Sequence, residues 1–443
     1  MAHGTGSDPT VSKSVGHWFE QMPITKAHWV AGLVLFVSFV IESWEMMIII
    51  FNSASVGAEF DLGTAEIGRL IGAMFIGMIP GALLWGKLID RLGRKTSLVL
   101  SLALYWPLPL LSALATSFEM LMLLRGIGGI VLAGALVVTF PYFEELVPVN
   151  ARGRATVYLS AGWPLGVLVA IGVTTLFMDA GWRWVVAFSA FTGLWAIVVY
   201  RFVPESPYWL SRKGRTEEAE AAIARLSDGL VTANVEPMAI AAHPDGEASF
   251  FDIFRGRFIR LTFLQTLINF CFSWGYWALT SWMPLLLAKK GLSAPQGLSF
   301  MAVSALFMFP GYIVASYLTG KFGRKRVMTA FVFIAAITGF GFANSATMFQ
   351  MYAWNFSLSF FSLGAWGVWN TWLGEIYTTD TRGAGVAWGV SAQRVANAIA
   401  PIAIGTMLAS SSFLQTVTFI STFLAVTFVG ALFLPEMEGK ILQ

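Results

Sequence analysis

The chain has 443 residues, of which 56% are hydrophobic and only 12% are charged, and its net charge is +3. Soluble domains are about 45–50% apolar and about 25% charged, so the composition excludes that class and predicts a membrane protein. The small net charge gives no indication of a nucleic-acid partner, and the single cysteine excludes an internal disulfide.

The apolar residues are grouped into twelve runs. Residues 1–21 are polar and lack the apolar core of a cleavable signal, so we expect no signal peptide there. Each later run has the length of about 20 residues that a membrane-spanning helix needs. Glycine, proline or charge closes each run. The predicted spans are 27–51, 65–88, 96–116, 119–142, 154–178, 184–203, 258–287, 298–319, 327–344, 350–373, 386–409 and 414–434.

These spans predict an all-α membrane protein of 12 transmembrane helices. The expected domains are an N-terminal tail 1–26, a six-helix bundle 27–203, a linker 204–257, a second six-helix bundle 258–434 and a C-terminal tail 435–443.

Ionisable residues inside the runs are few, and each costs roughly 2.5–3.5 kcal/mol at the middle of a spanning helix. Glu42 and Glu45 lie in the first run, three residues apart and therefore on one helix face. Arg125 lies in the fourth run, at about the same depth as Glu45 when each residue rises about 1.5 Å. We expect the three residues to form a proton switch, because protonating an acid releases the arginine. A static buried salt bridge is the alternative.

The linker 204–257 is the one clear change of composition. Within it, the segment Arg215–Glu220 has its acidic residues early, which is typical of a helix N-terminus. We expect short cytoplasmic helices that join the two bundles. A disordered linker is the alternative.

Basic residues lie mainly in the loops on one side of the predicted spans. The opposite loops hold only Arg183, Lys289 and Lys290, with Arg69 near the start of a run. The positive-inside rule therefore predicts an inner (cytoplasmic) membrane protein with both termini cytoplasmic.

Aromatic residues are concentrated in the seventh and tenth runs. Trp274, Tyr276 and Trp277 lie in the seventh run, and Trp366 lies in the tenth, one turn before Asn370. Such rings can stack a flat substrate, and an amide can hydrogen-bond to it. For any single ring, packing or lipid contact is the alternative.

Arg394 lies about eight residues past the start of the eleventh run, and thus ~12 Å into the membrane. A planar guanidinium can bind a carboxylate through two parallel hydrogen bonds. Gln393 and Asn397 can supply further hydrogen bonds. We therefore predict that this stretch binds an anionic substrate. The alternative is an arginine that pairs with helix carbonyls or with the buried glutamates.

Three short patterns recur at one fixed offset of 230 positions. A shared offset indicates two homologous halves, and such repeats are typical of secondary transporters. The paired positions are Gly93-Arg94-Lys95 with Gly323-Arg324-Lys325, Arg152 with Arg382, and Glu145 with Glu375.

The segment Gly86–Lys95 resembles the Gly-x-x-x-Asp-Arg-x-Gly-Arg-Lys/Arg loop of the major facilitator superfamily. Ser316–Lys325 resembles a degraded second copy of it. Pro204–Leu210 and Glu375–Gly383 resemble the loops after the sixth and tenth helices of sugar and organic-ion carriers, although Tyr208 stands where those carriers have arginine. The resemblance covers nearly the whole chain. It implies the major facilitator fold, with two pseudo-symmetric six-helix bundles.

Within that superfamily, the chain is most similar to the niacin-type, organic-ion and synaptic-vesicle-glycoprotein branch. Its members place an acidic pair in helix one and an arginine in helix four, and an arginine in helix eleven accompanies anionic substrates. The motifs also imply gating residues in the loops. These are Gly86, Asp90, Arg91, Gly93, Arg94, Glu145, Arg152, Glu205, Gly323, Arg324, Glu375 and Arg382.

The combined prediction is a proton-coupled symporter that imports a small organic anion, such as nicotinate or a benzoate-like acid. A proton-antiport exporter of drugs or metabolites, a carrier of organic cations or sugars, and a non-transporting binding protein are the alternatives. An enzyme is not expected, because the four histidines are scattered over termini, an interface and a loop. We expect no metal and no cofactor. The expected partners are the substrate, protons and the lipid bilayer, with the chain acting as a monomer.

Overall fold

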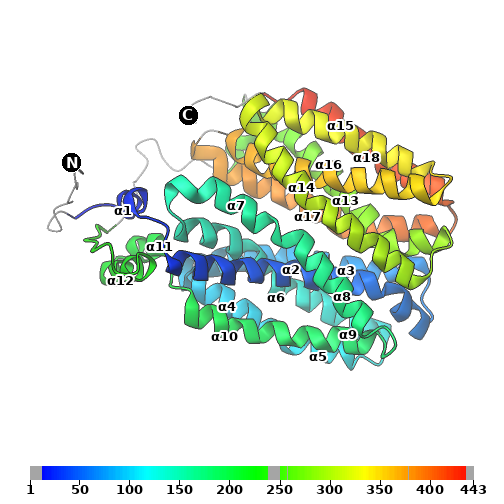
Figure 1. The fold of residues 1–443 in the computed structure, drawn as a ribbon, viewed down its shortest axis with the longest axis horizontal. Coiled ribbons are helices and arrows are strands. Elements are labelled where there is room, and N and C mark those ends of the chain that lie inside the picture. The colour runs from blue at the N-terminus through cyan, green and yellow to red at the C-terminus, as the bar shows by residue number, and fades with distance from the viewer. Residues whose placement is uncertain (1–11, 238–249, 257, 378, 436–443) are drawn as a thin grey trace.

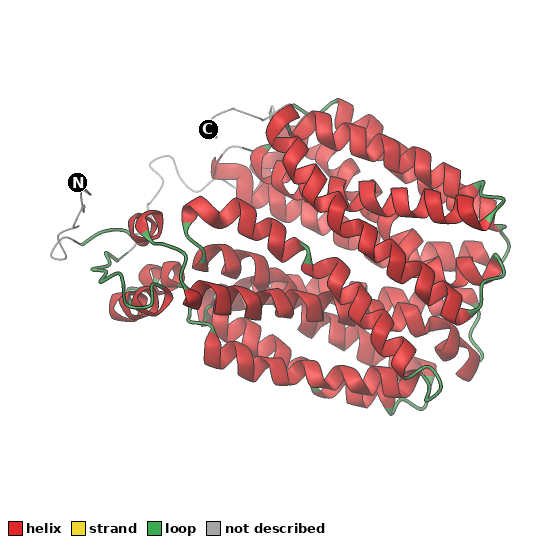
Figure 2. Cartoon of the chain, viewed as in Figure 1, coloured by secondary structure: helices red, strands yellow, loops and turns green. Residues whose placement is uncertain are grey.

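The computed structural model describes residues 12–237, 250–256, 258–377 and 379–435. These residues are almost entirely helical, and the strand-like contact among them is the isolated bridge between Lys13 and Val235. Figure 2 shows long helices running side by side, joined by short loops at both ends of the molecule. A helix satisfies its own backbone hydrogen bonds, which is the requirement that lipid imposes on an apolar chain.

The first bundle is built from six helical segments, three of which are broken. Pro107 begins α5 directly after Trp106, so the third segment breaks where proline removes a backbone donor. The elements are α2 (Lys26–Glu59), α3 (Thr64–Leu92), α4 (Arg94–Tyr105), α5 (Pro107–Ala113), α6 (Phe118–Leu146), η1 (Val149–Ala151), α7 (Arg152–Ser160), α8 (Gly162–Leu176), α9 (Trp182–Phe188), η2 (Ser189–Leu194) and α10 (Trp195–Phe202).

The second bundle contains six unbroken helices. Three of them, α14, α16 and α18, begin with a capping box in which Ser293, Thr347 or Ser412 is followed by a glutamine three residues later. The elements are α13 (Phe258–Lys289), α14 (Ala294–Phe322), α15 (Arg324–Ala343), α16 (Met348–Glu375), α17 (Thr379–Leu408) and α18 (Phe413–Leu432).

These segments correspond to the predicted spans. Within the described residues, nine helices are long and apolar enough to cross a membrane, and α13, α16 and α17 are comparably long. The helices extend past the predicted boundaries. For example, α2 continues to Glu59, eight residues beyond the predicted end at 51. Hydropathy detects only the apolar centre of a helix, so its polar ends were missed.

The linker contributes α11 (Pro207–Arg212), α12 (Thr216–Leu226) and η3 (Phe250–Phe254). Figure 1 shows α11 and α12, with α1 (Val15–Gln21), beyond one end of the first bundle. We call this the linker end and the opposite one the far end. The N-terminal segment is bound to the linker by two contacts. The Lys13 backbone N–H donates to the Asn234 carbonyl at 3.0 Å, and the ring centroids of Phe19 and Tyr208 are 5.4 Å apart.

The two bundles pack closely at the far end. A Cβ atom at Gly68 would lie 2.6 Å from the Pro401 carbonyl oxygen, and one at Gly72 would lie 2.9 Å from the Ala398 carbonyl oxygen. Gly405 is equally close to Thr64. Glycine therefore lets the backbones of α3 and α17 touch, and this contact closes the far end between the bundles.

Candidate functional site

Glu42 and Glu45 are both buried near the middle of α2, but their carboxylates have different surroundings. The Glu45 carboxylate accepts a hydrogen bond from the Tyr105 hydroxyl at 2.9 Å and another from the Thr192 hydroxyl at 3.3 Å. Both donors belong to the first bundle. Glu45 is therefore held by neutral groups within one half of the molecule.

Arg125 lies beside Glu45, but the contact is not the predicted carboxylate salt bridge. Its guanidinium donates to the Glu45 backbone carbonyl at 3.2 Å and contacts the Met74 sulfur at 2.7 Å. The Glu45 carboxylate is instead directed to Tyr105, so within the described residues the two charges interact without a direct ion pair.

Glu42 interacts with the other half of the molecule. The charge of Arg394 in α17 acts on it, although both carboxylate oxygens are buried without a hydrogen-bond partner among the described residues. Arg394 itself is half-buried, and in the described part of the chain its guanidinium makes neither a hydrogen bond nor a direct ion pair. A carboxylate and a guanidinium with unused hydrogen-bonding groups thus share the interface between the bundles.

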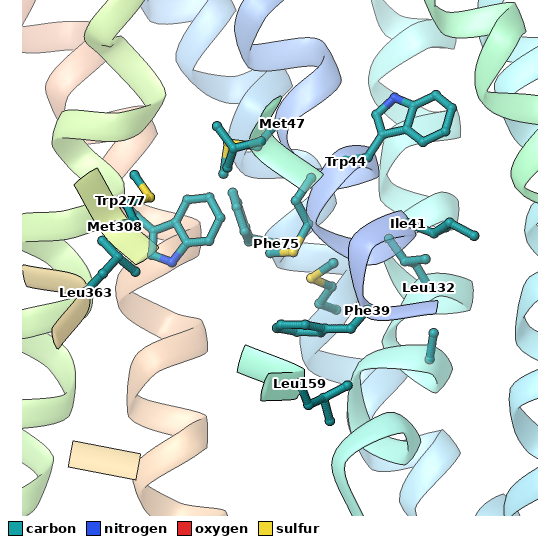
Figure 3. Packing of buried hydrophobic residues seen from close by; sticks show 14 of the residues in the cluster. Phe39, Ile41, Trp44, Met47, Phe75, Leu132, Leu159, Trp277, Met308 and Leu363 are labelled. Atoms are coloured by element: carbon teal, nitrogen blue, oxygen red, sulfur yellow. The ribbon is translucent and has the colours of Figure 1, made fainter. Parts of the chain in front are cut away.

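Aromatic rings from both bundles meet at the same interface. The Tyr276 hydroxyl accepts a hydrogen bond from Trp163 Nε1 of α8 at 2.8 Å. The Trp277 ring lies 4.7 Å from Phe75 of α3 and 5.6 Å from Trp163, between ring centroids. Figure 3 shows the Trp277 indole beside Phe75. Tyr276 and Trp277 therefore contact the first bundle directly.

Two further candidates lie on α16 and a third on α17. The Trp366 ring is 6.0 Å from Tyr276 and 5.1 Å from Phe272, so it belongs to the same aromatic group. Asn370, one turn further along α16, is exposed. Asn397 is buried, and its side-chain oxygen has no hydrogen-bond donor among the described residues.

Trp274 is not part of this aromatic group. Its ring stacks on Phe423 of α18, with 4.7 Å between centroids, and so packs inside the second bundle. Two residues along a helix correspond to a rotation of about 200°, which places Trp274 on the side of α13 opposite to Tyr276. Trp274, which was predicted to bind substrate, therefore packs away from the ring of Tyr276.

Gln393 is already engaged in a buried network. Its amide nitrogen donates to the Asn269 side-chain oxygen at 2.6 Å, and Trp369 Nε1 donates to the same oxygen at 2.8 Å. The Asn269 amide nitrogen in turn donates to Gln265 at 2.9 Å. Asn269 thus joins α13, α16 and α17, and one N–H of the Gln393 amide is engaged in this network.

Predicted gating residues form a network at the linker end. Arg94 pairs with Glu145 at 3.0 Å and with Asp90 at 3.5 Å. The Glu205 carboxylate accepts hydrogen bonds from the backbone N–H groups of Arg94 and Lys95, at 2.9 and 3.0 Å. The network therefore ties the start of the linker to the α3–α4 and α6–α7 connections of the first bundle.

The other predicted gating residues of the first half lie at the edges of this network or outside it. Arg152 donates to the Tyr208 hydroxyl at 2.8 Å, so the tyrosine that departs from the family pattern still makes a polar contact. Arg91 is exposed, and a Cβ atom at Gly86 would meet no atom within 4 Å. Neither Arg91 nor Gly86 belongs to the network.

The second half repeats part of this geometry. Gly93 and Gly323 both adopt positive φ, 95° and 86°, immediately before α4 and α15. Arg324 follows as the first residue of α15. Arg382 is half-buried early in α17, whereas the Glu375 side chain lies outside the described residues. The repeated glycine conformation supports the two homologous halves.

Sequence reasoning missed the neutral partners of Glu45 and of Gln393. Tyr105, Thr192 and Asn269 are polar residues within otherwise apolar segments, and that position was the signal available. Among the described residues, no three His, Cys, Asp or Glu side chains lie close enough together to hold a metal ion.

The sequence matches a known protein family along most of the chain. The profile of the Major Facilitator Superfamily matches residues 34–343 and 266–442. The chain is 33% identical over 433 residues to the niacin transporter NiaP of Acinetobacter baylyi, covering 96% of this chain and 98% of the relative. It is 27% identical to the putative niacin/nicotinamide transporter NiaP of Bacillus subtilis, covering 88% and 90%.

Two further proteins of lower sequence identity match nearly the whole chain. The chain is 26% identical to the synaptic vesicle 2-related protein of Bos taurus, covering 96% of this chain and 81% of the relative. The xylose transporter XylE from E. coli, solved in a partially occluded inward-open conformation, superposes with a TM-score of 0.77. That match has 21% identity and covers 94% of this chain and 100% of XylE. It confirms the predicted fold.

Proposed function

Because the chain belongs to the major facilitator superfamily, as its loop motifs predicted, we propose that it imports a small organic anion together with a proton. Family membership makes the chain a multi-pass membrane transporter and not an enzyme. The proposed substrate is an aromatic monocarboxylate such as nicotinate. Two relatives named as niacin transporters support this choice.

Arg394 is the observation that carries the proposal. It is a guanidinium of α17 without a hydrogen-bond partner among the described residues, and its charge acts on Glu42 of the other bundle. A guanidinium in a water-poor site binds a carboxylate strongly, since both hydrogen bonds are charge-assisted. Tyr276, Trp277 and Trp366 would stack the substrate ring.

Proton coupling follows from competition for Arg394. In the proposed cycle, Glu42 of the empty carrier can be ionised because the charge of Arg394 acts on it. When a substrate carboxylate takes the guanidinium, a second negative charge at Glu42 would be buried and unpaired, at a cost of several kcal/mol. Binding of the anion therefore favours protonation of Glu42, so one proton travels with one carboxylate. Glu45 and Arg125, held within the first bundle, would support α2.

The linker end is proposed to be cytoplasmic, with both termini on that side, because the basic loops lie there. The close contact of α3 with α17 at the far end then corresponds to a carrier closed toward the outside. The Arg94 network would hold the start of the linker on the first bundle, and opening to the outside would rock one bundle against the other.

Uptake of labelled nicotinate into proteoliposomes of the purified protein tests this function. An inward proton gradient should increase uptake, and an uncoupler should abolish that increase. Gradient-independent nicotinate uptake would remove the proton from the mechanism. Failure to transport or bind nicotinate and benzoate would reject the organic-anion proposal and favour cationic or neutral substrates, or export.

A further inference from the structure

A small cavity lies between α13, α14 and α16, outward of the aromatic group. Its volume is about 70 Å³, and Phe51 and Val167 close it from the first bundle. Met308 and Leu363, both labelled in Figure 3, contribute to its mostly apolar wall. Because a buried water needs about 10–15 Å³ of cavity volume, the cavity has room for roughly five to seven waters, or for part of one small ring.

The cavity continues the proposed substrate site. Tyr276 lines it and also belongs to the aromatic group around Trp366. Asn355, Ser359 and Ser362 of α16 line it as well. These residues and Trp366 follow one another at spacings of four, three and four, so they form one stripe on a single helix face. Ser362 lies one turn, about 6 Å, from Trp366 along the axis.

Two hydroxyl groups of this stripe are unused. Serines in the spanning helices of this protein commonly donate to the carbonyl four residues earlier, as Ser357 and Ser421 do at 2.8 Å. Ser359 and Ser362 are buried, yet neither makes a hydrogen bond within the described residues. Both therefore keep a donor for a ligand in the cavity.

Two neighbouring polar side chains, Ser304 and Asn355, already donate hydrogen bonds. Ser304 donates to the Phe300 carbonyl at 2.8 Å and accepts a hydrogen bond from the Asn355 amide. None of the described residues that line the cavity is charged. It is thus suited to an uncharged hydrogen-bond acceptor on a ring, such as the lone pair of an aromatic nitrogen, and not to a second ionised group.

We propose that the substrate ring extends from Arg394 into this cavity, and that the hydroxyl of Ser359 or Ser362 donates a hydrogen bond to the single lone pair of a ring nitrogen there. The inference rests on the proposed function and narrows its substrate class to heteroaromatic monocarboxylates. A carbocyclic acid fits the same space but leaves both hydroxyls without a partner. The two serines thus determine specificity for a pyridine ring over a benzene ring.

Binding of four acids to purified protein tests the inference, measured by isothermal titration: benzoate and the pyridine-2-, pyridine-3- and pyridine-4-carboxylates. Wild type should bind at least one pyridine acid more tightly than benzoate. In Ser359→Ala/Ser362→Ala, the affinity for that acid should fall by about 3- to 10-fold, the usual effect of losing a neutral hydrogen bond. Benzoate affinity should stay unchanged. Ser357→Ala, whose hydroxyl bonds within α16, is the matched control and should keep the wild-type ratio.

Each outcome decides between the two proposals. If wild type binds benzoate and the pyridine acids equally, or if the double variant keeps the wild-type ratio, the serine subsite is rejected while the organic-anion function stands. If wild type binds none of the four acids, both the function and the subsite are rejected. Arg394→Ala should weaken all four acids, which separates the carboxylate contact from the ring contact.

Discussion

Replacing Arg394 by alanine removes the cation proposed to hold the substrate carboxylate. Arg125 is also buried, but it is occupied by the Glu45 backbone carbonyl and the Met74 sulfur. It therefore cannot take over the role of Arg394. The expected result is a specific loss of carboxylate binding by a protein that still folds.

The size of the loss follows from the proposed contact. A hydrogen bond to a charged group contributes about 1.5–3 kcal/mol. Since about 1.4 kcal/mol corresponds to a tenfold change in affinity, Arg394→Ala should weaken nicotinate binding by about 10- to 100-fold. Arg394→Lys should give a smaller loss, because an ammonium keeps the charge but not the planar, two-pronged geometry.

Arg394→Ala also leaves Glu42 without its opposite charge. An uncompensated buried charge destabilises the folded protein, so the variant should melt at a lower temperature than wild type when Glu42 is ionised. Arg394→Ala/Glu42→Gln removes both charges. It should recover most of the melting temperature but none of the nicotinate affinity.

Isothermal titration with nicotinate and a melting curve of each variant measure the two effects separately. A folded Arg394→Ala protein with wild-type nicotinate affinity would refute the carboxylate contact. Equal melting temperatures of the single and double variants would show that Glu42 and Arg394 do not interact.

Three further substitutions have distinct expected results. Wild-type uptake should rise as the external pH falls, because protonated Glu42 frees Arg394; Glu42→Gln should abolish this response in proteoliposome uptake while nicotinate exchange continues. Gly72→Ile should prevent closure at the far end, since even a Cβ would lie 2.9 Å from the Ala398 carbonyl oxygen; nicotinate binding should persist in titrations while net uptake is lost. Gly93→Ala should lower the free energy of unfolding by about 1–3 kcal/mol, and with it the melting temperature, because alanine is strained at positive φ. Gly86→Ala, where a Cβ atom meets open space, should leave the melting temperature unchanged.

Much of the architecture was predictable from the chain alone. Twelve apolar runs, the shared offset of the Gly-Arg-Lys motifs and the loop signatures predicted the helices, the two halves and the family. These features are local: lipid requires an apolar run of spanning length wherever a helix crosses it. A glycine at positive φ before α4 and α15 likewise reflects a local backbone requirement, which is why Gly93 and Gly323 were both recognisable.

The partners of the buried charges were not predictable in this way. Helical spacing placed Glu42 and Glu45 on one face, but a face is wide enough to contact two neighbours. The structure directs Glu45 to Tyr105 and Thr192, and leaves Glu42 to the charge of Arg394. The choice depends on which helix lies opposite each side chain, and three residues correspond to a rotation of about 300°, so their directions differ by about 60°.

The same distinction applies to the aromatic and polar residues of the second bundle. Composition alone identified α13 and α16 as rich in rings and amides, but not that Trp274 packs on Phe423 or that Gln393 is bound to Asn269. Nor did it single out Ser359 and Ser362. The order of residues along a helix determines which side chains share a face, whereas only the packing of one helix against another determines which faces meet a partner and which line a cavity.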